Sequence, residues 1–322
     1  MSEFDLIARI APLLDGAGDD VVVGHGDDAA VVRVGGSEVV VAVDVVVEGV
    51  HFRRDLSSWE DVGWKAVAVN VSDLAAMGAI PAAAVIGLCR PAGFGEDDVE
   101  ALYRGLRAAC DQWDLRLVGG DSVSGPALVV SVTTFGRVGG SGAVTRAGAL
   151  PGDRLVVVGA LGAAAAALAQ VARGARPDPA HLAAHRRPRA LPEAGRSLAQ
   201  HGARAMIDVS DGLGADLGHL CAASGVAARV TASALPVAPG AREVGGWRLV
   251  CGGGEDFALV AALPPECAEE AARAAADAGG VLAAVVGEVH EPHGTTVVLD
   301  LPGGGTLDLD RMGYDHFREG DK

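Results

Sequence analysis

Acidic side chains near glycine recur at six places in the 322-residue sequence, each following or interrupting an apolar segment. Carboxylate oxygens among small neighbours are the ligands that hard divalent cations require, and Mg²⁺ commonly binds one or two carboxylates together with substrate phosphates. One acidic turn alone is typical of solvated surface, but six in similar settings favour a cation site. The segments are GHGDDAAVV, VVVAVDVVVEGVHF, VNVSDLAAMGA, LVGGDS, MIDVSDGLGAD and CGGGEDFAL.

Asp44 stands at the centre of the valine run, where strand propensity is strong. An ionised aspartate between β-branched residues costs free energy to bury unless it is paired, hydrogen-bonded or bound to a metal. Two interpretations of Asp44 follow from this stretch alone. It lies at the rim of a strand with no special role, or it is a metal ligand held in place by a well-packed strand.

Positive side chains that could hold a phosphate are almost all arginine, because the chain has only two lysines, Lys65 and Lys322. The absence of GxxxxGK[ST] excludes a P-loop, and the absence of GxGxxG at a strand-to-helix turn argues against dinucleotide binding. A bound nucleotide would therefore depend on metal ions for most of its charge neutralisation. Arg146, in VTRAGALPGD, is a candidate for a bidentate phosphate contact, the alternative being an ordinary loop arginine.

The histidine and serine residues give weaker indications of a metal site or a catalytic nucleophile. His181 and His185 have the i, i+4 spacing of metal ligands, but HLAAH lacks the glutamate of HExxH, so we expect no metal there. Ser210 and Ser122 have no His/Asp partner that would indicate a nucleophile. His51, in EGVHF, either contacts a substrate or serves the structure.

The elements that position these residues alternate between strand and helix in both halves of the chain. We predict strands near 21, 29–34, 39–47, 115–118 and 128–138, with helices over 60–77 and 96–113. The glycine-rich segment 139–152 lacks periodicity and predicts a domain boundary, after which a strand begins at 154 and the alternation resumes. The expected fold class is α/β (α+β), with an N-terminal domain at 1–138 and a C-terminal domain at 139–322.

Composition limits the classes of binding partner and the compartment in which the protein is expected. The net charge of −16 argues against nucleic acid or an anionic membrane surface. Five widely spaced cysteines without CxxC indicate neither a disulfide framework nor a zinc cluster, and they fit a reducing compartment. With no basic, apolar leader visible, we expect a cytoplasmic protein. The apolar run 155–172 is long enough to span a membrane, but its valines, paired glycines and alanines predict a strand, a turn and a helix.

Eight segments together resemble the thiamine-monophosphate kinase family of the aminoimidazole-ribonucleotide-synthetase-related superfamily. They are GHGDDAAVV, DVVVEGVHF, VNVSDLAAMGA, VGGDS, TRAGALPGD, MIDVSDGL, GGGEDF and GYDHF, in the family's order along nearly the whole chain. The resemblance implies a homodimer whose N-terminal domains form a barrel-like interface and whose C-terminal α/β domains complete the site. It also implies phosphorylation of thiamine monophosphate to thiamine diphosphate with ATP and several Mg²⁺ ions, without a general base.

The resemblance further implies roles for individual residues. Metal binding falls on Asp28, Asp44, Asp73, Asp121, Asp208 and, at a further position, Asp211. ATP contacts fall on Gly120, Asp121, Arg146, Ser210 and, by a looser match, Tyr103. Substrate contacts fall on His51, Glu255 and Tyr314.

Two departures from the family pattern stand out. Ala42 and Val43 precede Asp44 where the family commonly has Ser or Thr, so one metal either uses backbone carbonyls or water instead or binds more weakly. The usual GGEDYE is GGEDFA, which keeps Glu255. Two alternatives remain open: an ATP-dependent cyclo-ligase of the same superfamily, and a non-catalytic protein that binds divalent cations.

Overall fold

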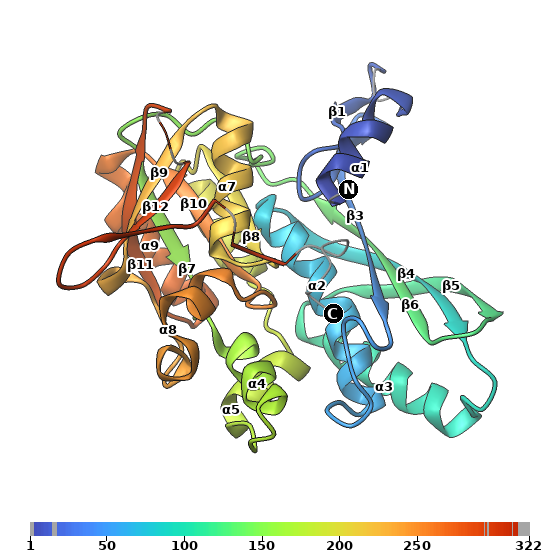
Figure 1. Ribbon diagram of the computed structural model, residues 1–322. Helices are drawn as coiled ribbons and strands as arrows, with labels where there is room; N and C mark the ends of the chain where they lie inside the picture. Colours follow the sequence, from blue (N-terminus) through green and yellow to red (C-terminus); the bar gives the residue numbers. More distant parts are fainter. Residues whose placement is uncertain (1–2, 15–17, 293, 295, 311, 315–322) are drawn as a thin grey trace.

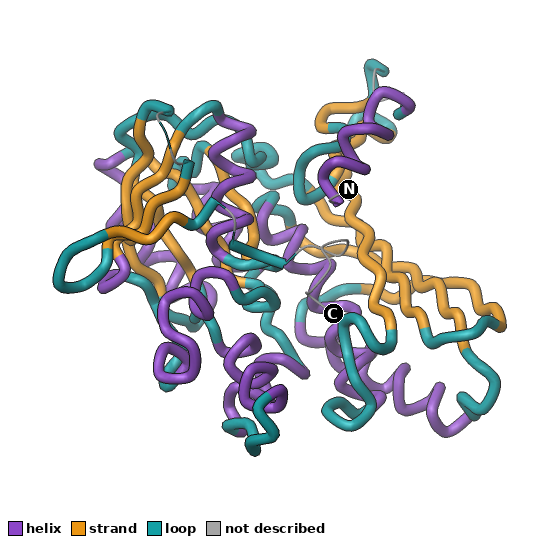
Figure 2. The backbone as a smooth tube through the Cα atoms, in the orientation of Figure 1, coloured by secondary structure: helices purple, strands orange, loops and turns teal. Residues whose placement is uncertain are grey.

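The computed structural model describes residues 3–14, 18–292, 294, 296–310 and 312–314. Two β-sheets form two halves of the molecule, and helix α2 (Trp59–Ala76) lies between them (Figures 1 and 2). The predicted boundary between residues 138 and 139 falls just after the last strand of the first sheet. The mixed α/β character expected from the sequence is present in both halves.

The first sheet has six strands in the order β1-β2-β3-β6-β4-β5. Neighbouring strands are antiparallel except for β4 and β5, which are parallel. Helix α2 and helix α3 (Glu96–Gln112) cover one face of this sheet, and helix α1 (Glu3–Ile10) precedes it. The strands are β1 (Val21–Val23), β2 (Ala30–Val34), β3 (Ser37–Val47), β4 (Ile80–Arg90), β5 (Arg116–Ser124) and β6 (Val129–Arg137).

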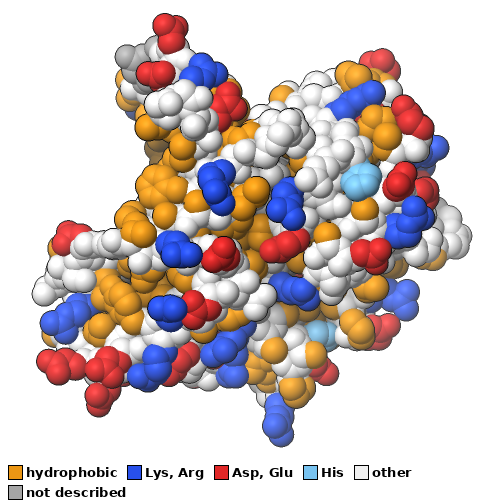
Figure 3. All heavy atoms as spheres, turned by 180° about the vertical axis from the view of Figure 1, so that it is seen from behind, with side chains coloured by type: hydrophobic (Ala, Val, Ile, Leu, Met, Phe, Trp, Pro, Cys, Tyr) orange, Lys and Arg blue, Asp and Glu red, His pale blue; other side chains and the backbone are white. Residues whose placement is uncertain are grey.

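Alternation along β3 explains how the valine run is used. Ala42 and Val46 are buried against the helices, whereas Val43 and Val45 are 60% and 43% exposed on the opposite face. Since successive side chains in a strand point to opposite faces, the sheet has one covered face and one open, apolar face. Hydrophobic side chains gather on this half of the molecule beside the protruding N-terminal segment (Figure 3).

Helices α2 and α3 cross unusually closely because glycine stands at the contact on both. A Cβ atom built on Gly63 would lie 2.2 Å from the carbonyl oxygen of Leu102, and one on Gly105 would lie 2.0 Å from that of Glu60. The first turn of α2 is fixed by a capping box in which Ser58 and Asp61 each accept a backbone N–H from the other. Both features fix the position of α2.

The second sheet has seven strands in the order β13-β12-β9-β11-β7-β10-β8, antiparallel except for β12 with β9. Its strands are β7 (Arg154–Val158), β8 (Ala205–Val209), β9 (Ala227–Thr231), β10 (Ala258–Leu263), β11 (Ala283–His290), β12 (Val297–Asp300) and β13 (Thr306–Asp308). Its helices are α4 (Ala163–Ala172), α5 (Pro179–Arg186), α6 (Pro192–Gln200), α7 (Leu213–Ser224), α8 (Ala241–Gly252) and α9 (Pro265–Gly279).

The C-terminal end of α2 is part of the second domain's core. Ala75 and Ala76 belong to a buried cluster with Val156 and Leu198. A Cβ atom on Gly195, in α6, would lie 2.0 Å from the carbonyl oxygen of Ala75, so the two helices touch backbone to backbone. Helix α2 therefore connects both cores, and any side chain on it has a fixed position relative to both domains.

Two sequence-based expectations can be checked directly. The apolar run 155–172 forms strand β7, a turn and helix α4, as predicted, and no helix among the described residues is long and apolar enough to cross a membrane. Strand β4 was not predicted. Its first half, with Pro81 and three alanines, has weak strand propensity, and pairing with β6 and β5 on either side overrides it.

Candidate active site between the domains

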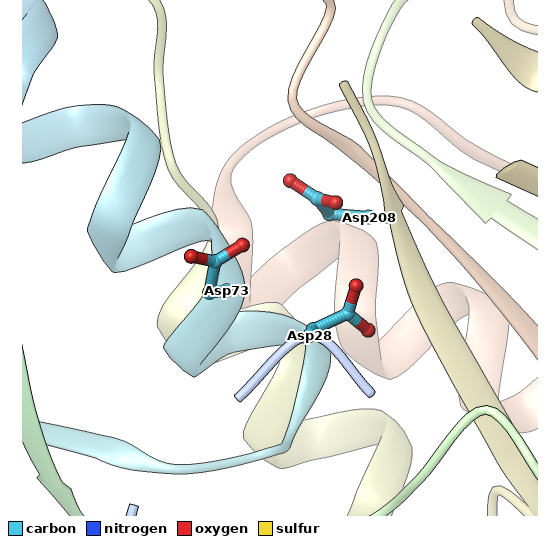
Figure 4. Close-up of side chains that lie close together, drawn as sticks. All are labelled: Asp28, Asp73 and Asp208. Carbon is cyan, nitrogen blue, oxygen red and sulfur yellow. The ribbon is translucent and has the colours of Figure 1, made fainter. Parts of the chain in front are cut away.

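Three carboxylates from separate elements meet beside α2. Asp28 lies in the loop before β2, Asp73 on α2 and Asp208 on β8, and one carboxylate oxygen of each lies within 4.8 Å of the others. Their side chains face a common space (Figure 4). Residues 28, 73 and 208 are thus brought together only because α2 packs against both sheets.

Burial and mutual repulsion raise the pKa values of all three carboxyl groups. The pKa of Asp208 rises to about 8, through burial first and then the charge of Asp28. The pKa of Asp28 rises to about 6 through burial, although Arg146 opposes the shift. The pKa of Asp73 rises well above its ordinary value because of burial and then the charges of Asp44 and Asp208. A cation among these groups would relieve the repulsion.

The donor set fits a hard divalent cation. Oδ1 of Asp28 accepts hydrogen bonds from Nε and Nη2 of Arg146, at 3.2 and 2.6 Å. Oδ2 of Asp28 is buried and has no hydrogen-bond partner among the described residues, a costly arrangement for a carboxylate oxygen. Oδ2 of Asp208 accepts from the hydroxyl of Ser72 at 2.6 Å, which orients that group. Oriented carboxylate oxygens with an unused acceptor are what Mg²⁺ coordination needs.

Asp44 lies next to this cluster because strand β3 loses a neighbour there. Strand β2 pairs with β3 only as far as Val41, so the backbone N–H of Asp44 has no strand partner on that side. The side-chain oxygen of Asn70, on α2, accepts this N–H at 2.9 Å. The interpretation of Asp44 as a bare strand end is therefore incomplete, because helix α2 holds it beside Asp73, whose pKa its charge raises.

Arg146 closes the cluster from the interdomain segment. Its backbone N–H donates to both carboxylate oxygens of Asp27, at 3.2 and 3.1 Å, while its guanidinium contacts Asp28. Burial alone would lower the pKa of Arg146, but the charge and hydrogen bond of Asp28 raise it, so the group stays charged. A fixed guanidinium beside carboxylates is well placed to contact a phosphate that binds with cations.

Two of the residues expected at the substrate end, His51 and Glu255, form a second group around Lys65 of α2. Lys65 forms an ion pair with Oε1 of Glu255 and donates a hydrogen bond to the carbonyl oxygen of His51 at 2.8 Å. Nδ1 of His185 lies 2.5 Å from Oε2 of Glu255. Tyr314 lies at the SDGL turn, where its backbone N–H donates to the carbonyl oxygen of Asp211 at 3.0 Å.

The turn after β8 connects the two groups. The buried carboxylate of Asp216 accepts the backbone N–H groups of Asp211 and Gly212, both at 3.0 Å, and so holds the turn that carries Ser210. The backbone N–H of Glu255 donates to the carbonyl oxygen of Ser210 at 2.7 Å. The turn after β8 therefore carries the expected ATP contact Ser210 and the expected metal position Asp211, and one backbone hydrogen bond joins it to the segment of the expected substrate contact Glu255.

Gly120, Asp121 and Tyr103 do not join these groups within one chain. Asp121 pairs with Gly87 in register, which places its side chain on the open face of the sheet with Val45, whereas Asp44 is on the covered face. A Cβ atom on Gly120 would lie 2.2 Å from the carbonyl oxygen of Ile86, so only glycine fits there. Tyr103 lies on α3, packed against the first domain's core. The roles expected for these three remain predictions.

Sequence reasoning missed the supporting residues. Lys65 and His185 contact Glu255, while Asn70, Ser72 and Asp216 orient the aspartates or the turn beside them. HLAAH lacks a metal-site glutamate, so local sequence gives His185 no role as a metal ligand. Its carboxylate partner is Glu255, seventy positions away. The rarity of lysine was the one signal that could have singled out Lys65, since a lone lysine amid an apolar helix needs a partner.

Comparison with known proteins gives a consistent result. Residues 26–138 match the N-terminal domain, and residues 151–300 the C-terminal domain, of the AIR synthase related proteins. Thiamine-monophosphate kinase of Bacillus subtilis is 35% identical over 333 aligned residues, covering 99% of this chain and 100% of that protein. The Mycobacterium tuberculosis enzyme of the same name is 43% identical over 252 residues, covering 75% of this chain and 74% of that protein.

A solved structure agrees over the same length. AaThiL complexed with AMPPCP and TMP superimposes with a TM-score of 0.83 at 31% identity, covering 98% of this chain and 97% of that one. The similarity thus extends over nearly the full length of both chains. The chain belongs to the thiamine-monophosphate kinase family, within the AIR synthase related proteins.

Proposed function

We propose that this chain transfers the γ-phosphoryl group of ATP to thiamine monophosphate and so produces thiamine diphosphate. The observation that carries the proposal is the full-length similarity to a kinase structure that holds an ATP analogue and TMP, combined with the converging carboxylates of Asp28, Asp73 and Asp208. Phosphoryl transfer from ATP needs a site that binds phosphates, and this chain has no P-loop. Cations held by the carboxylate cluster, together with the half-buried Arg146, would supply that site.

We assign Mg²⁺ to the carboxylates of Asp28, Asp73 and Asp208, with Asp44 and Asp211 beside them. Bound Mg²⁺ would offset the repulsion between two phosphate-bearing reactants and stabilise the charge of an in-line transfer. Ala42 and Val43 offer no side-chain oxygen, so the remaining ligands come from water, phosphate or backbone carbonyls.

The chain's own residues then bind and orient the reactants. Arg146, fixed by Asp27 and Asp28, contacts phosphate oxygens, and the rigid turn of Ser210 contacts the nucleotide. The attacking atom is a phosphate oxygen that is largely deprotonated at neutral pH, since the second pKa of a phosphate monoester is about 6. No residue is therefore needed as a general base.

We further propose a homodimer formed through the open face of the first sheet, where two such faces would close a barrel. Val43, Val45 and Val123 are each more than two-fifths exposed on this face, an apolar area that a monomer rarely shows. Asp44 and Asp121 lie on opposite faces and on strands three places apart, about 14 Å across the sheet. If both bind metal as the family pattern implies, Asp121 of a second copy completes the site.

The direct test is ADP release from ATP and Mg²⁺ in the presence of thiamine monophosphate, with the product identified by chromatography. Thiamine and formylglycinamidine ribonucleotide serve as competing substrates. Turnover with thiamine monophosphate alone supports the proposal, whereas turnover with the ribonucleotide would assign the chain to the cyclo-ligase reaction. An Asp44→Asn variant should bind no productive Mg²⁺–ATP and lose turnover, and near wild-type activity in that variant at low Mg²⁺ would contradict the metal assignment.

A further inference from the structure

Lys65 is a buried cation whose two partners belong to different domains. It is the one lysine in the part of the chain that the structure describes, and only 3% of its side chain is exposed. Burying an ammonium group is costly unless it is paired and hydrogen-bonded. The two partners of Lys65 are the carbonyl oxygen of His51, in the loop after β3, and the carboxylate of Glu255, just before β10.

Each partner is itself held in one conformation. The backbone N–H of Val47 donates to Nδ1 of His51 at 3.1 Å, so the neutral ring carries its proton on Nε2. Glu255 has a left-handed backbone, with φ at +69°, and its N–H is bonded to Ser210. A non-glycine residue keeps such a backbone only where its surroundings enforce it.

His185 engages the other oxygen of Glu255. Its side chain is 4% exposed, and its Nδ1 donates to Oε2 at 2.5 Å, while Lys65 takes Oε1. Side chains from α2 of the first domain and α5 of the second thus bind one carboxylate oxygen each. Burial opposes ionisation of Glu255, but the charge of Lys65 and the hydrogen bond of His185 lower its pKa to about 2.

We propose that Lys65 is a positioning residue that fixes His51 and Glu255 relative to each other at the substrate end of the site, with His185 completing the orientation of Glu255. The inference rests on the proposed function and on the family resemblance, which assigns His51 and Glu255 to substrate binding; we take them to face the organic part of thiamine monophosphate. That part carries a cationic ring and an amino group. An ionised carboxylate in a fixed orientation can lie against the ring or accept a hydrogen bond from the amino group. Lys65 reaches neither the aspartate cluster nor Arg146 in the contacts the structure shows. It meets the carboxylate of Glu255, whereas Ser210 is bonded to the backbone of Glu255, so we expect the loss of Lys65 to act mainly on thiamine monophosphate.

The test measures KM for each substrate separately in Lys65→Met. We expect KM for thiamine monophosphate to rise about 10- to 100-fold, the loss of a charged hydrogen bond, while KM for ATP changes less than about threefold. Arg204→Met is the matched control, because it removes the cationic partner of Asp153, a carboxylate only 1% exposed, away from the site. Equal KM values for thiamine monophosphate in both variants, or a parallel rise in KM for ATP, would overturn the proposal.

A double-mutant cycle shows whether Lys65 acts through Glu255. The double variant Lys65→Met/Glu255→Gln should raise KM for thiamine monophosphate no further than Glu255→Gln alone, whereas independent effects that multiply would refute the inference. His185→Gln, which leaves Lys65 in place, gives the same readout if Lys65→Met does not fold. Calorimetric binding of thiamine monophosphate to wild type separates the two hypotheses: no binding or turnover in wild type refutes the proposed function, and intact binding in Lys65→Met refutes the positioning role alone.

Discussion

At the scale of single residues, the site consists of carboxyl groups whose charges repel one another. Burial and mutual repulsion push Asp28, Asp73 and Asp208 toward protonation. The charge of Arg146 opposes this shift at all three, and its guanidinium contacts Asp28. Such an arrangement weakens the fold and persists where function requires it. It also couples protonation, metal binding and stability in a way that can be measured.

We predict that Mg²⁺ stabilises the protein more at alkaline than at acidic pH. The folded-state pKa values of Asp28 and Asp208 are raised to about 6 and about 8, so their contribution to stability is fully present below pH about 4 and is lost as pH rises through those values. A bound cation replaces the proton, so the increase in Tm caused by Mg²⁺ over EDTA should grow from pH 5 to pH 8.

Two variants check this prediction by thermal unfolding. Asp208→Asn should be more stable than wild type in EDTA at about pH 8, because one repelling charge is gone, and it should gain less from Mg²⁺. Asp300→Asn removes an exposed carboxylate paired with Arg229 and should keep the wild-type pH dependence. A Mg²⁺ effect on Tm that is the same at every pH and in both variants would show that the three acids do not hold the ion.

At the scale of elements, helix α2 positions both halves of the site. Lys65 contacts the substrate group, Asn70 and Ser72 orient Asp44 and Asp208, and Asp73 is itself in the cluster. The helix can do this because glycines let α3 and α6 approach its backbone closely. Displacing α2 by even a fraction of an ångström would move all four side chains together.

We predict that Gly105→Ala lowers stability and activity together. The new methyl group would meet the carbonyl oxygen of Glu60 at 2.0 Å, so α3 must move away from α2, at a cost of about 1–3 kcal/mol. Gly218→Ala, within α7, meets no atom within 4 Å and should raise stability by about 0.5–1 kcal/mol. Urea unfolding midpoints test both changes, and equal effects would mean that the helix crossing tolerates a side chain.

We also predict that Asn70→Ala destabilises the protein by about 1–3 kcal/mol and weakens Mg²⁺ binding, because the backbone N–H of Asp44 loses its acceptor. Thr134→Val provides the comparison. The Thr134 hydroxyl is buried without a hydrogen-bond partner among the described residues, so its removal should be neutral or stabilising. Unfolding free energies and Mg²⁺ titrations would contradict this account if both variants behaved alike.

At the scale of the whole molecule, the open sheet face and the position of Asp121 both concern whether a second copy of the chain packs against the first sheet. The face is apolar and exposed, and Asp121 projects from it, away from the cluster that contains Asp73 and Asp208. A second copy of the chain would both cover the valines and bring an aspartate to the site. The dimer and the completion of the site are therefore a single hypothesis.

We predict that two inactive variants complement each other. Asp121→Asn and Asp208→Asn should each lose turnover alone, but a mixed dimer would contain one site with both aspartates intact. Unfolding and refolding an equal mixture should restore about a quarter of wild-type activity, since half of the dimers are mixed and half of their sites are complete. No activity in the mixture, with dimers confirmed by light scattering, would place Asp121 and Asp208 in one chain's site or Asp121 outside any site.

Most of the elements and the family were predictable from local sequence. Valine-rich strands, the helix over 60–77 and the division of the run 155–172 follow from local propensity and periodicity, which act within a few residues. The acidic motifs were recognisable because each is a short local pattern. Strand β4 was missed because its alanines have little propensity of their own, and its conformation is imposed by pairing with β6 and β5.

Which carboxylates meet depends on how the elements pack, and local sequence does not reveal it. Asp44 and Asp121 look equivalent in sequence, yet strand register puts them on opposite faces, because one residue's shift in pairing reverses the side-chain direction. Lys65, His185 and Glu255 are separated by up to 190 positions, and nothing local marks them as partners. The packing of two sheets against α2 brings them together, because long-range contacts depend on how whole elements pack and not on the residues that neighbour them in the chain.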